Sequence, residues 1–416
     1  MSSDQEQVQV RFVTKQQQYA VKDAAILVPA DFKRYGLSEI INNLLGLEKP
    51  IPFEFLIDGE ILRASIADYL TGQQLSTENL VTIEYMESML PPTPLTSYQH
   101  DDWISSVQGY ESFFLTGSYD NMVRLWNSSG ECTNTLIGHT EAVKSVKFGP
   151  STSNSMMLFS AGLDHTALAW QVSDDNEELL YECQGHEAAI ESLAVNSTKS
   201  HLATASADAT IKIWTTNVPS EDEATIKESA PKKKRRTEQK SRLTKAQAVT
   251  LNGHVGAVNA VDFDSADGNI VYSGGWDHSI RSWDIEQQVN TTTKNCEKVV
   301  LDVDYSGDAR LIATGHTDNL VRLWDPRSED GVNVKLALRG HKGWVSSVSW
   351  APHSPYSLCS GSYDGSIRIW DIRSKGPVYT LEEQDHPKVL AVDWCGDRII
   401  SGGEDKKLGL FQAKAF

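Results

Sequence analysis

The chain has 416 residues and a formal net charge of −18, from 56 acidic and 38 basic side chains. Such an acidic surface repels phosphate groups, so broad nucleic-acid binding by the body of the protein is disfavoured and protein partners are favoured. The five scattered cysteines form no C-x-x-C pair, so we expect neither disulfides nor a structural zinc site. No apolar run is long enough to span a membrane, and residues 1–9 do not resemble a signal peptide. We therefore expect a soluble intracellular protein.

Residues 8–87 have the pattern of a small domain of mixed α and β structure. Val8–Val13 alternates between apolar and polar side chains as a half-buried strand does, and residues 19–29 can return beside it as a hairpin. Residues 37–45 have helical spacing that stops at Gly46. The remaining expected elements are strands at residues 53–57, 61–63 and 81–85, with a turn at Asp58–Gly59.

This order of elements is that of the β-grasp fold, so we expect a small α+β ubiquitin-like (β-grasp) domain at residues 1–92. The segment after its last strand, Met86–Pro92, has no Gly-Gly tail. We therefore do not expect this domain to be conjugated to other proteins.

From residue 93 onward one pattern occurs seven times: an aspartate is followed six residues later by a large aromatic ring. Successive aromatic residues are separated by 44, 44, 69, 41, 46 and 41 residues, and all but one of these spacings suit a four-stranded propeller blade. The pattern predicts an all-β seven-bladed propeller at residues 93–416. The pairs are Asp120/Trp126, Asp164/Trp170, Asp208/Trp214, Asp277/Trp283, Asp318/Trp324, Asp364/Trp370 and Asp405/Phe411.

Each repeat also carries polar residues that need hydrogen-bond partners when buried. A serine or threonine stands four residues before each aspartate, and a histidine precedes most of these aspartates by 19 to 25 residues. A chain of hydrogen bonds from the indole through the hydroxyl and the histidine to the aspartate would satisfy all of these groups. The histidines are His100, His139, His186, His254, His341 and His386, and Cys296 takes this place in the fifth repeat.

The last repeat lies too near residue 416 to supply a fourth strand of its own. Only five residues follow Phe411, whereas residues 94–99 lie just before the first repeat. We therefore expect residues 94–99 to complete the seventh blade, which closes the ring and removes the open sheet edges.

The long spacing after Trp214 marks an insertion at about residues 217–248. It changes from acidic at Glu221–Glu223 to basic after Pro231 and has few large apolar side chains, so we expect it to be disordered. Five consecutive basic residues are typical of a nuclear-localisation signal, although solvated charge runs often match by chance, and contact with RNA is a second use. The run is Lys232, Lys233, Lys234, Arg235 and Arg236.

Five aromatic residues near the expected loops are candidates for partner binding. Three directly precede a turn aspartate, and two follow a blade histidine by three residues. Aromatic side chains are enriched among interface hot spots, although rings at these positions could equally cap the central channel. The candidates are Trp103, Tyr119, Trp276, Trp344 and Tyr363.

We expect neither an enzymatic site nor a bound cofactor. The sequence has no H-E-x-x-H, P-loop or G-x-S-x-G motif, and the blade pattern accounts for six of its eleven histidines. Residues 302–307 begin like a calcium loop, but the acid required at its twelfth position is Ala313 and the repeat places these residues on a strand.

The repeats resemble the WD-repeat family, and the Trp-Asp pair itself stands at Trp283–Asp284, Trp324–Asp325 and Trp370–Asp371. The front domain contains the runs Arg34–Ile40 and Pro52–Glu60. With these runs and seven repeats, essentially the whole chain is similar to the WD-repeat ribosome-biogenesis subunits of the pescadillo complex, which carry a Notchless-type ubiquitin-like domain. The resemblance implies a non-enzymatic assembly factor for the large (60S) ribosomal subunit, needed for pre-rRNA processing.

The same resemblance implies partners and a location. The partners would be homologues of pescadillo and of the block-of-proliferation WD-repeat protein, the pre-60S particle, and the AAA ATPase midasin, which grips the ubiquitin-like domain and removes the protein. The location would be the nucleus, nucleolus and nucleoplasm. By position, Glu78 is the carboxylate that would bind a Mg²⁺ ion held by midasin, whereas composition alone makes it an ordinary loop glutamate.

A function of another class also suits the two expected domains. Propellers often serve as substrate-receptor subunits of ubiquitin ligases, and a ubiquitin-like domain could recruit the ligase. Co-purification separates the two hypotheses, because one predicts pre-rRNA and large-subunit proteins and the other predicts cullin-type subunits.

Overall fold

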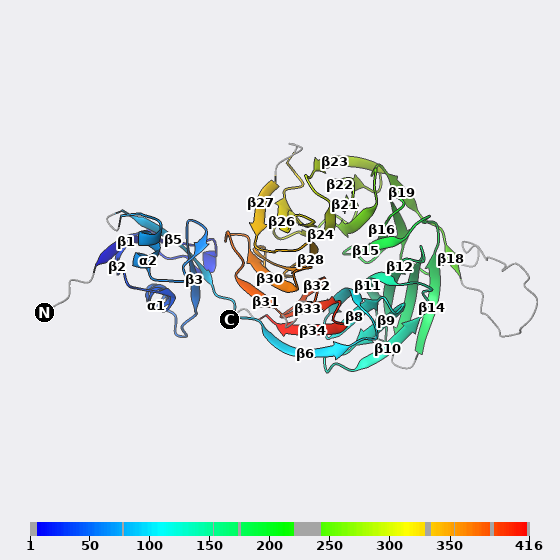
Figure 1. The fold of residues 1–416 in the computed structure, drawn as a ribbon, viewed down its shortest axis with the longest axis horizontal. Helices are drawn as coiled ribbons and strands as arrows, with labels where there is room; N and C mark the ends of the chain where they lie inside the picture. Colours follow the sequence, from blue (N-terminus) through cyan, green and yellow to red (C-terminus); the bar gives the residue numbers. More distant parts are fainter. Residues whose placement is uncertain are drawn as a thin grey trace, which may run out of the picture.

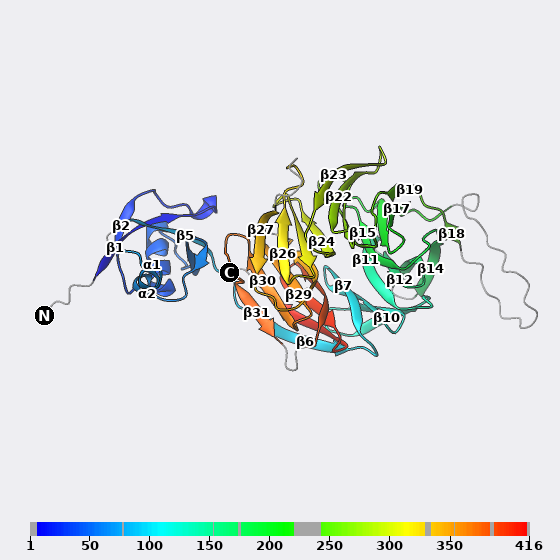
Figure 2. The same cartoon turned by 45° about the horizontal axis from the view of Figure 1, so that its top comes forward.

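The computed structural model describes residues 6–76, 79–152, 154–173, 176–219, 243–328, 334–352, 354–382 and 387–413. A small domain lies beside a ring of sheets, seen face-on in Figure 1 and tilted in Figure 2. These are the α+β unit and the all-β seven-bladed propeller that the sequence predicts. Among the described residues, no helix is long and apolar enough to cross a membrane.

The small domain is a five-stranded sheet with two α-helices and one 3-10 turn. Its elements are β1 (Gln7–Val13), the 3-10 turn (Gln17–Tyr19), β2 (Ala25–Pro29), α1 (Arg34–Leu45), β3 (Phe53–Ile57), β4 (Glu60–Ile61), α2 (Ile66–Gly72) and β5 (Val81–Glu87). The strands are ordered β2-β1-β5-β3-β4, and Leu37 and Ile41 of α1 are fully buried in the core of this domain. Helix α1 ends at Gly46, whose φ of 64° is the left-handed conformation that glycine adopts readily. The sequence pattern missed α2, a short helix that begins with a capping box at Ser65.

The propeller consists of seven antiparallel blades, each built from an inner strand on the channel, two middle strands and an outer strand. Blades one to three are β7 (Ile104–Tyr110), β8 (Phe113–Ser118), β9 (Met122–Trp126) and β10 (Cys132–Ile137); β11 (Val143–Ser151), β12 (Ser155–Gly162), β13 (Ala167–Ser173) and β14 (Asn176–Cys183); and β15 (Ile190–Val195), β16 (His201–Ser206), β17 (Thr210–Thr215) and β19 (Val249–Asn252).

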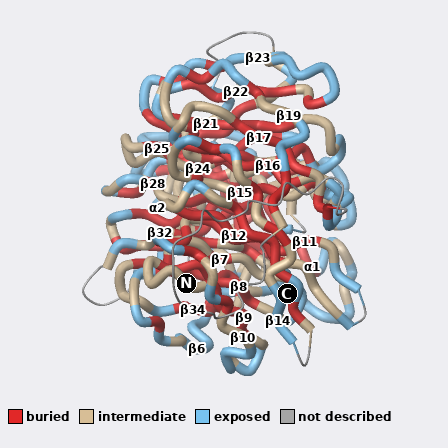
Figure 3. Tube along the Cα trace, turned by 90° about the vertical axis from the view of Figure 1, so that its right-hand side faces the viewer, coloured by how far each residue is buried: buried red, intermediate tan, exposed pale blue. Residues whose placement is uncertain are grey.

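Blades four to seven complete the ring. They are β20 (Val258–Phe263), β21 (Ile270–Gly275), β22 (Ser279–Asp284) and β23 (Val289–Asn295); β24 (Val300–Ser306), β25 (Leu311–His316), β26 (Leu320–Trp324) and β27 (Val334–Arg339); β28 (Val345–Trp350), β29 (Ser357–Ser362), β30 (Ser366–Asp371) and β31 (Tyr379–Glu382); and β32 (Val389–Cys395), β33 (Arg398–Gly403), β34 (Lys407–Gln412) and β6 (Thr93–Gln99). Buried residues concentrate in the strands and exposed residues at the loops and outer edges (Figure 3).

The ring closes as the sequence predicts. Strand β6 pairs with β34 in antiparallel register, from Gln99 opposite Lys407 to Thr93 opposite Gln412. The seventh blade therefore combines three strands from the C-terminal end with one from the start of the propeller.

The expected disorder of residues 217–248 is wrong at the C-terminal end of this segment. Strand β18 (Thr244–Lys245) pairs in parallel with β14 and becomes a fifth strand of blade two. The buried Lys245 ammonium donates to the carbonyl of Thr215 at 2.6 Å and lies 4.7 Å from the ring centroid of Tyr181. These contacts, rather than local sequence, order the end of the insertion; the basic run at residues 232–236 lies outside the described residues.

The small domain contacts the propeller at blade six. On the small domain the contact is made by the turn between β3 and β4, by the segment after β4 and by the segment that leaves β5; on the propeller it is made by the loop between β30 and β31 and the first residue of β31. Three hydrogen bonds cross it: Lys375 N to Gly59 O (2.8 Å), Arg63 Nη2 to Val378 O (2.9 Å) and Tyr379 Oη to Met89 O (2.8 Å).

A buried chain of hydrogen bonds holds each of four blades together. In blade six, Trp370 Nε1 donates to Ser360 Oγ at 2.7 Å, His341 Nε2 lies 2.7 Å from the same oxygen, and His341 Nδ1 lies 3.1 Å from the Asp364 carboxylate. Although burial opposes it, hydrogen bonds from His341, Ser366 and the Lys342 amide hold the pKa of Asp364 well below its usual range. The same chain occurs through Trp170, Ser160, His139 and Asp164; Trp214, Thr204, His186 and Asp208; and Trp283, Ser273, His254 and Asp277.

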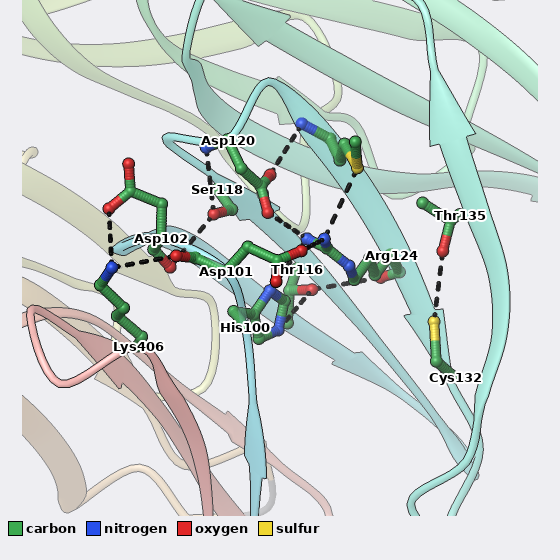
Figure 4. Close-up of polar contacts among 12 residues, drawn as sticks. His100, Asp101, Asp102, Thr116, Ser118, Asp120, Arg124, Cys132, Thr135 and Lys406 are labelled. Atoms are coloured by element: carbon green, nitrogen blue, oxygen red, sulfur yellow. Dashed lines mark hydrogen bonds and ion pairs between the residues drawn. The ribbon is translucent and has the colours of Figure 1, made fainter.

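Blade one departs from this arrangement because Arg124 lies between the histidine and the aspartate (Figure 4). Its guanidinium is 2.6 Å from Asp120 and 3.2 Å from His100 Nδ1, and His100 Nε2 is 3.4 Å from Thr116 Oγ1. Burial and, second, the Arg124 charge lower the pKa of His100 to about 4, so this histidine is neutral at pH 7.

In blade five, Arg322 and His316 take the place of the single histidine that links hydroxyl and aspartate in other blades, and the repeat spacing predicted neither residue. Arg322 pairs with Asp318, and His316 Nε2 lies 2.7 Å from Thr314 Oγ1. Cys296, at the place expected for the histidine, is buried and contacts neighbouring strands instead. His386 of blade seven lies outside the described residues.

Replacing Asp364 by alanine should destabilise blade six. His341 Nδ1, the Lys342 amide and Ser366 would lose their common acceptor, at a cost of roughly 1–3 kcal/mol in the free energy of unfolding. Chemical denaturation of the whole chain measures this difference. Asp308→Ala, at an exposed loop aspartate, is the control, and equal stability of both variants would contradict the structural role of the repeat.

Candidate partner-binding site at the channel mouth

The seven inner strands surround a channel that has a cavity toward each end. At the end where blade loops carry the predicted aromatic residues, a cavity of about 410 Å³ opens, and a second cavity of about 580 Å³ lies at the opposite end. Both cavities are lined by Lys147, Asp262, Asp304 and Asp393, so they meet in the middle of the channel. We call the first opening the channel mouth.

Four of the five predicted aromatic residues line the channel mouth, and the fifth packs beside them. Tyr119, Trp276, Trp344 and Tyr363 border the cavity, while the ring of Trp103 lies 5.8 Å from that of Tyr119. Trp276 is 51% exposed, Trp344 43% and Trp103 40%, which is unusual for tryptophan. Exposed rings gathered at one opening are available to a partner.

Backbone hydrogen bonds fix the positions of these rings. Each of the three residues before a turn aspartate donates its amide to a carbonyl of the neighbouring loop: Tyr119 to Trp103 (2.9 Å), Trp276 to Ala257 (2.8 Å) and Tyr363 to Trp344 (2.9 Å). In blade six this bond brings two rings into a stack, with centroids 5.6 Å apart. The turn geometry of the repeat therefore places aromatic side chains on the surface, as a pair in blades one and six and singly, as Trp276, in blade four.

The charges at the rim occur as local pairs. Lys144 lies 3.2 Å from Glu191 and 3.4 Å from the Tyr119 hydroxyl, and Lys388 lies 2.7 Å from Glu404 and over the ring of Tyr363. Burial lowers the pKa of Lys144, but Glu191 and Tyr119 more than offset this and raise it overall. The charges of the rim thus largely compensate one another.

Below the rim, carboxylates join blade four to five, blade five to six and blade seven to one. Asp302 accepts the Val348 amide at 2.8 Å, and Asp304 accepts the Trp350 amide at 2.6 Å. Asp262 and Asp393 act in the same way on blades five and one. Burial raises the pKa of Asp302 to about 6; burial and then Asp262 raise that of Asp304.

The sequence analysis did not assign a role to these aspartates. A repeated signal exists, because three inner strands share the pattern Val-x-x-Val-Asp-aromatic, which ends at Phe263, Tyr305 and Trp394. The interpretation of residues 302–307 as strand rather than calcium loop agrees with β24. Among the described residues, no group of three or more His, Cys, Asp or Glu side chains is placed to hold a metal ion.

Two other predicted sites lie outside the described residues: Glu78 and the basic run Lys232–Arg236. On either side of residues 77–78, Leu75 and Leu80 are 47% and 48% exposed. The described residues between α2 and β5, 73–76 and 79–80, are exposed.

Comparison with known proteins matches both parts of the chain. The NLE (NUC135) domain model matches residues 8–70, and the WD domain, G-beta repeat model matches residues 92–127, 130–171, 177–215, 245–284, 287–325 and 333–371. The fold and these matches define a WD-repeat propeller protein with an NLE domain. The seventh blade is outside the six matched repeats but has its four strands in the structure.

Similar proteins from distant organisms cover the whole chain. A "Ribosome biogenesis protein WDR12 homolog" from Nematostella vectensis is 37% identical over 98% of this chain and 100% of its own length. "Ribosome biogenesis protein YTM1" from Kluyveromyces lactis is 36% identical over 98% of both chains, and a WDR12 homolog from Chlamydomonas reinhardtii is 35% identical over 99% of both. The chain belongs to this WDR12/YTM1 family of ribosome biogenesis proteins.

Replacing Trp276 by alanine should weaken partner binding without unfolding the propeller, because the ring is half exposed and its loop is fixed by backbone bonds. For a hot-spot residue we expect a loss of at least about 2 kcal/mol in binding free energy. Quantitative co-purification of the full chain and its partners measures the effect. Ile137→Ala, at a 71% exposed residue on an outer strand, is the control; unchanged recovery of every partner with Trp276→Ala would reject the hot-spot role.

Proposed function

We propose that the chain is a non-enzymatic assembly factor of the large (60S) ribosomal subunit. The observation that carries this proposal is the full-length similarity to ribosome biogenesis proteins, which includes both the NLE domain and the repeats. In this proposal the propeller is a scaffold in a complex with homologues of pescadillo and the block-of-proliferation protein. The exposed aromatic residues at the channel mouth support a surface for protein partners.

The ubiquitin-like domain serves as a handle for the ATPase midasin. It has its own core, which includes Phe53, Phe55 and Tyr85, and it lies outside the ring of blades (Figure 1). A domain of this kind can be gripped while the propeller stays in its complex. Glu78 supplies the carboxylate to a Mg²⁺ ion held by midasin, and the exposed Leu75 and Leu80 offer apolar contact on either side.

The protein acts in the nucleus, nucleolus and nucleoplasm. The basic run Lys232–Arg236 belongs to an insertion whose described ends leave blade three and return at β18, on the side of the ring away from the small domain (Figure 1). Import machinery could reach a segment in this place without disturbing the propeller core. The same run is available for rRNA contact in the assembled particle.

Glu78→Ala should weaken midasin binding by roughly 1.5–3 kcal/mol while leaving the β-grasp fold intact, because it removes a charged ligand from a loop. Glu78→Asp should also bind weakly, because Mg²⁺ demands near-ideal distances and the shorter side chain alters them. Binding of the full chain to the midasin adhesion domain, with Mg²⁺ and with a chelator, measures this. Glu48→Ala, at an exposed loop glutamate of the same domain, should bind normally; metal-independent binding, or full binding by Glu78→Ala, would overturn the role of Glu78.

Deleting residues 221–240 should leave the blades folded and reduce nuclear accumulation. The segment lies between β17 and β18, outside the blade strands, and it contains the basic run. Fluorescence microscopy of the tagged chain measures the nuclear fraction, in cells depleted of its partners so that import on a partner does not hide the effect. Unchanged accumulation would place the signal elsewhere in the chain.

The proposed function is tested by purifying the tagged chain from cells and identifying what accompanies it. We expect pre-rRNA and large-subunit ribosomal proteins. Recovery of cullin-type subunits without ribosomal precursors would instead favour a substrate receptor of a ubiquitin ligase.

A further inference from the structure

The rim of the channel mouth and the deeper part of the cavity differ in their charge. At the rim, exposed rings stand beside charges that are already paired, such as Lys144 with Glu191 and Lys388 with Glu404. A third rim lysine, Lys406, lies 3.6 Å from Asp102. A partner that covers the rim therefore meets exposed rings and paired charges, and need not supply charge of either sign.

Deeper in the cavity the lining charge is predominantly negative. Beyond the Lys144–Glu191 pair, the lining contains Asp262, Asp302, Asp304 and Asp393 against the single ammonium of Lys147. A narrow channel with low-dielectric walls strengthens the field of these carboxylates and favours a cation that enters from the mouth.

Asp302 is the carboxylate best placed to meet such a cation. It lines the mouth cavity but not the cavity at the opposite end, whereas the other three aspartates line both. Its oxygens accept the Val303 and Val348 amides at 2.9 and 2.8 Å, which fixes the carboxylate in place. Its hydrogen-bond donors are neutral, and the Lys147 ammonium acts on the other three aspartates as well, so a further guanidinium or ammonium group would add compensating charge.

We propose that the channel mouth binds a protein segment that packs apolar side chains against the rim aromatics and inserts one arginine or lysine side chain into the channel toward Asp302. This inference rests on the proposed role of the mouth as a partner surface and specifies the chemistry of the occupant. Charge complementarity selects the basic side chain, and the same negative field disfavours nucleic-acid phosphates. The exposed rings select a protein segment over a free small cation.

Selection from a library of short random peptides displayed on phage, with the full chain immobilised, tests the proposal. Enriched peptides should carry an arginine or lysine next to aromatic or aliphatic residues. Synthetic copies of them should bind roughly tenfold or more weakly to Asp302→Asn, because the charged partner is lost while asparagine keeps an acceptor for the Val348 amide. Asp308→Asn, at the other end of the channel, should bind normally.

Two further variants separate the outcomes. Replacing the basic residue of an enriched peptide by glutamine should reduce binding to the native chain by the same factor and leave binding to Asp302→Asn unchanged. The Trp276→Ala variant should bind every enriched peptide more weakly than the native chain does. Enriched peptides without a basic residue, equal binding to native chain and Asp302→Asn, or no peptide that depends on these positions would overturn the proposal. These outcomes do not depend on whether the chain co-purifies with ribosomal precursors, so the two proposals fail separately.

Discussion

The pairing of β6 with β34 is the constraint on which the rest of the structure depends. Without β6, blade seven would lack its outer strand and the ring would expose an unpaired edge. The contacts between inner strands also depend on the closed ring, because each channel aspartate accepts a hydrogen bond from a backbone amide of the following blade. In particular, Asp393 of blade seven accepts the Gly109 amide of blade one at 2.7 Å, across the point where the circle closes.

This closure also determines how the small domain is attached. Strand β5 ends at Glu87 and β6 begins at Thr93, so the small domain is joined by a short segment directly to the strand that closes the ring. The hydrogen bonds made by Lys375, Val378 and Tyr379, at the β30–β31 loop and the start of β31, fasten the same region to blade six. A partner that pulls on the domain would load the closing strand and this contact together, whereas a partner on the channel mouth would contact the loops that carry Trp276, Trp344 and Tyr363.

The sequence predicts most of this fold because the repeat records a physical requirement: a buried indole, hydroxyl, histidine and aspartate must satisfy one another. It predicts less where another residue meets the same requirement, as Arg124 and His316 do in blades one and five. Helix α2 is too short for a periodic signal, and β18 is ordered by the Lys245 contacts from distant strands. At the site, aromatic placement follows from turn position, whereas the channel aspartates become adjacent only when the ring closes.

Residues 93–99 belong to the propeller, and we propose that the small domain before them is separable from the blades that bind partners. Sedimentation of two truncated chains with ribosomal precursors tests this most directly. Residues 93–416 should fold and sediment with large-subunit precursors, whereas residues 100–416, which lack β6, should lose both the cooperative unfolding of the propeller and the association. Equal folding and equal association of the two would contradict the account.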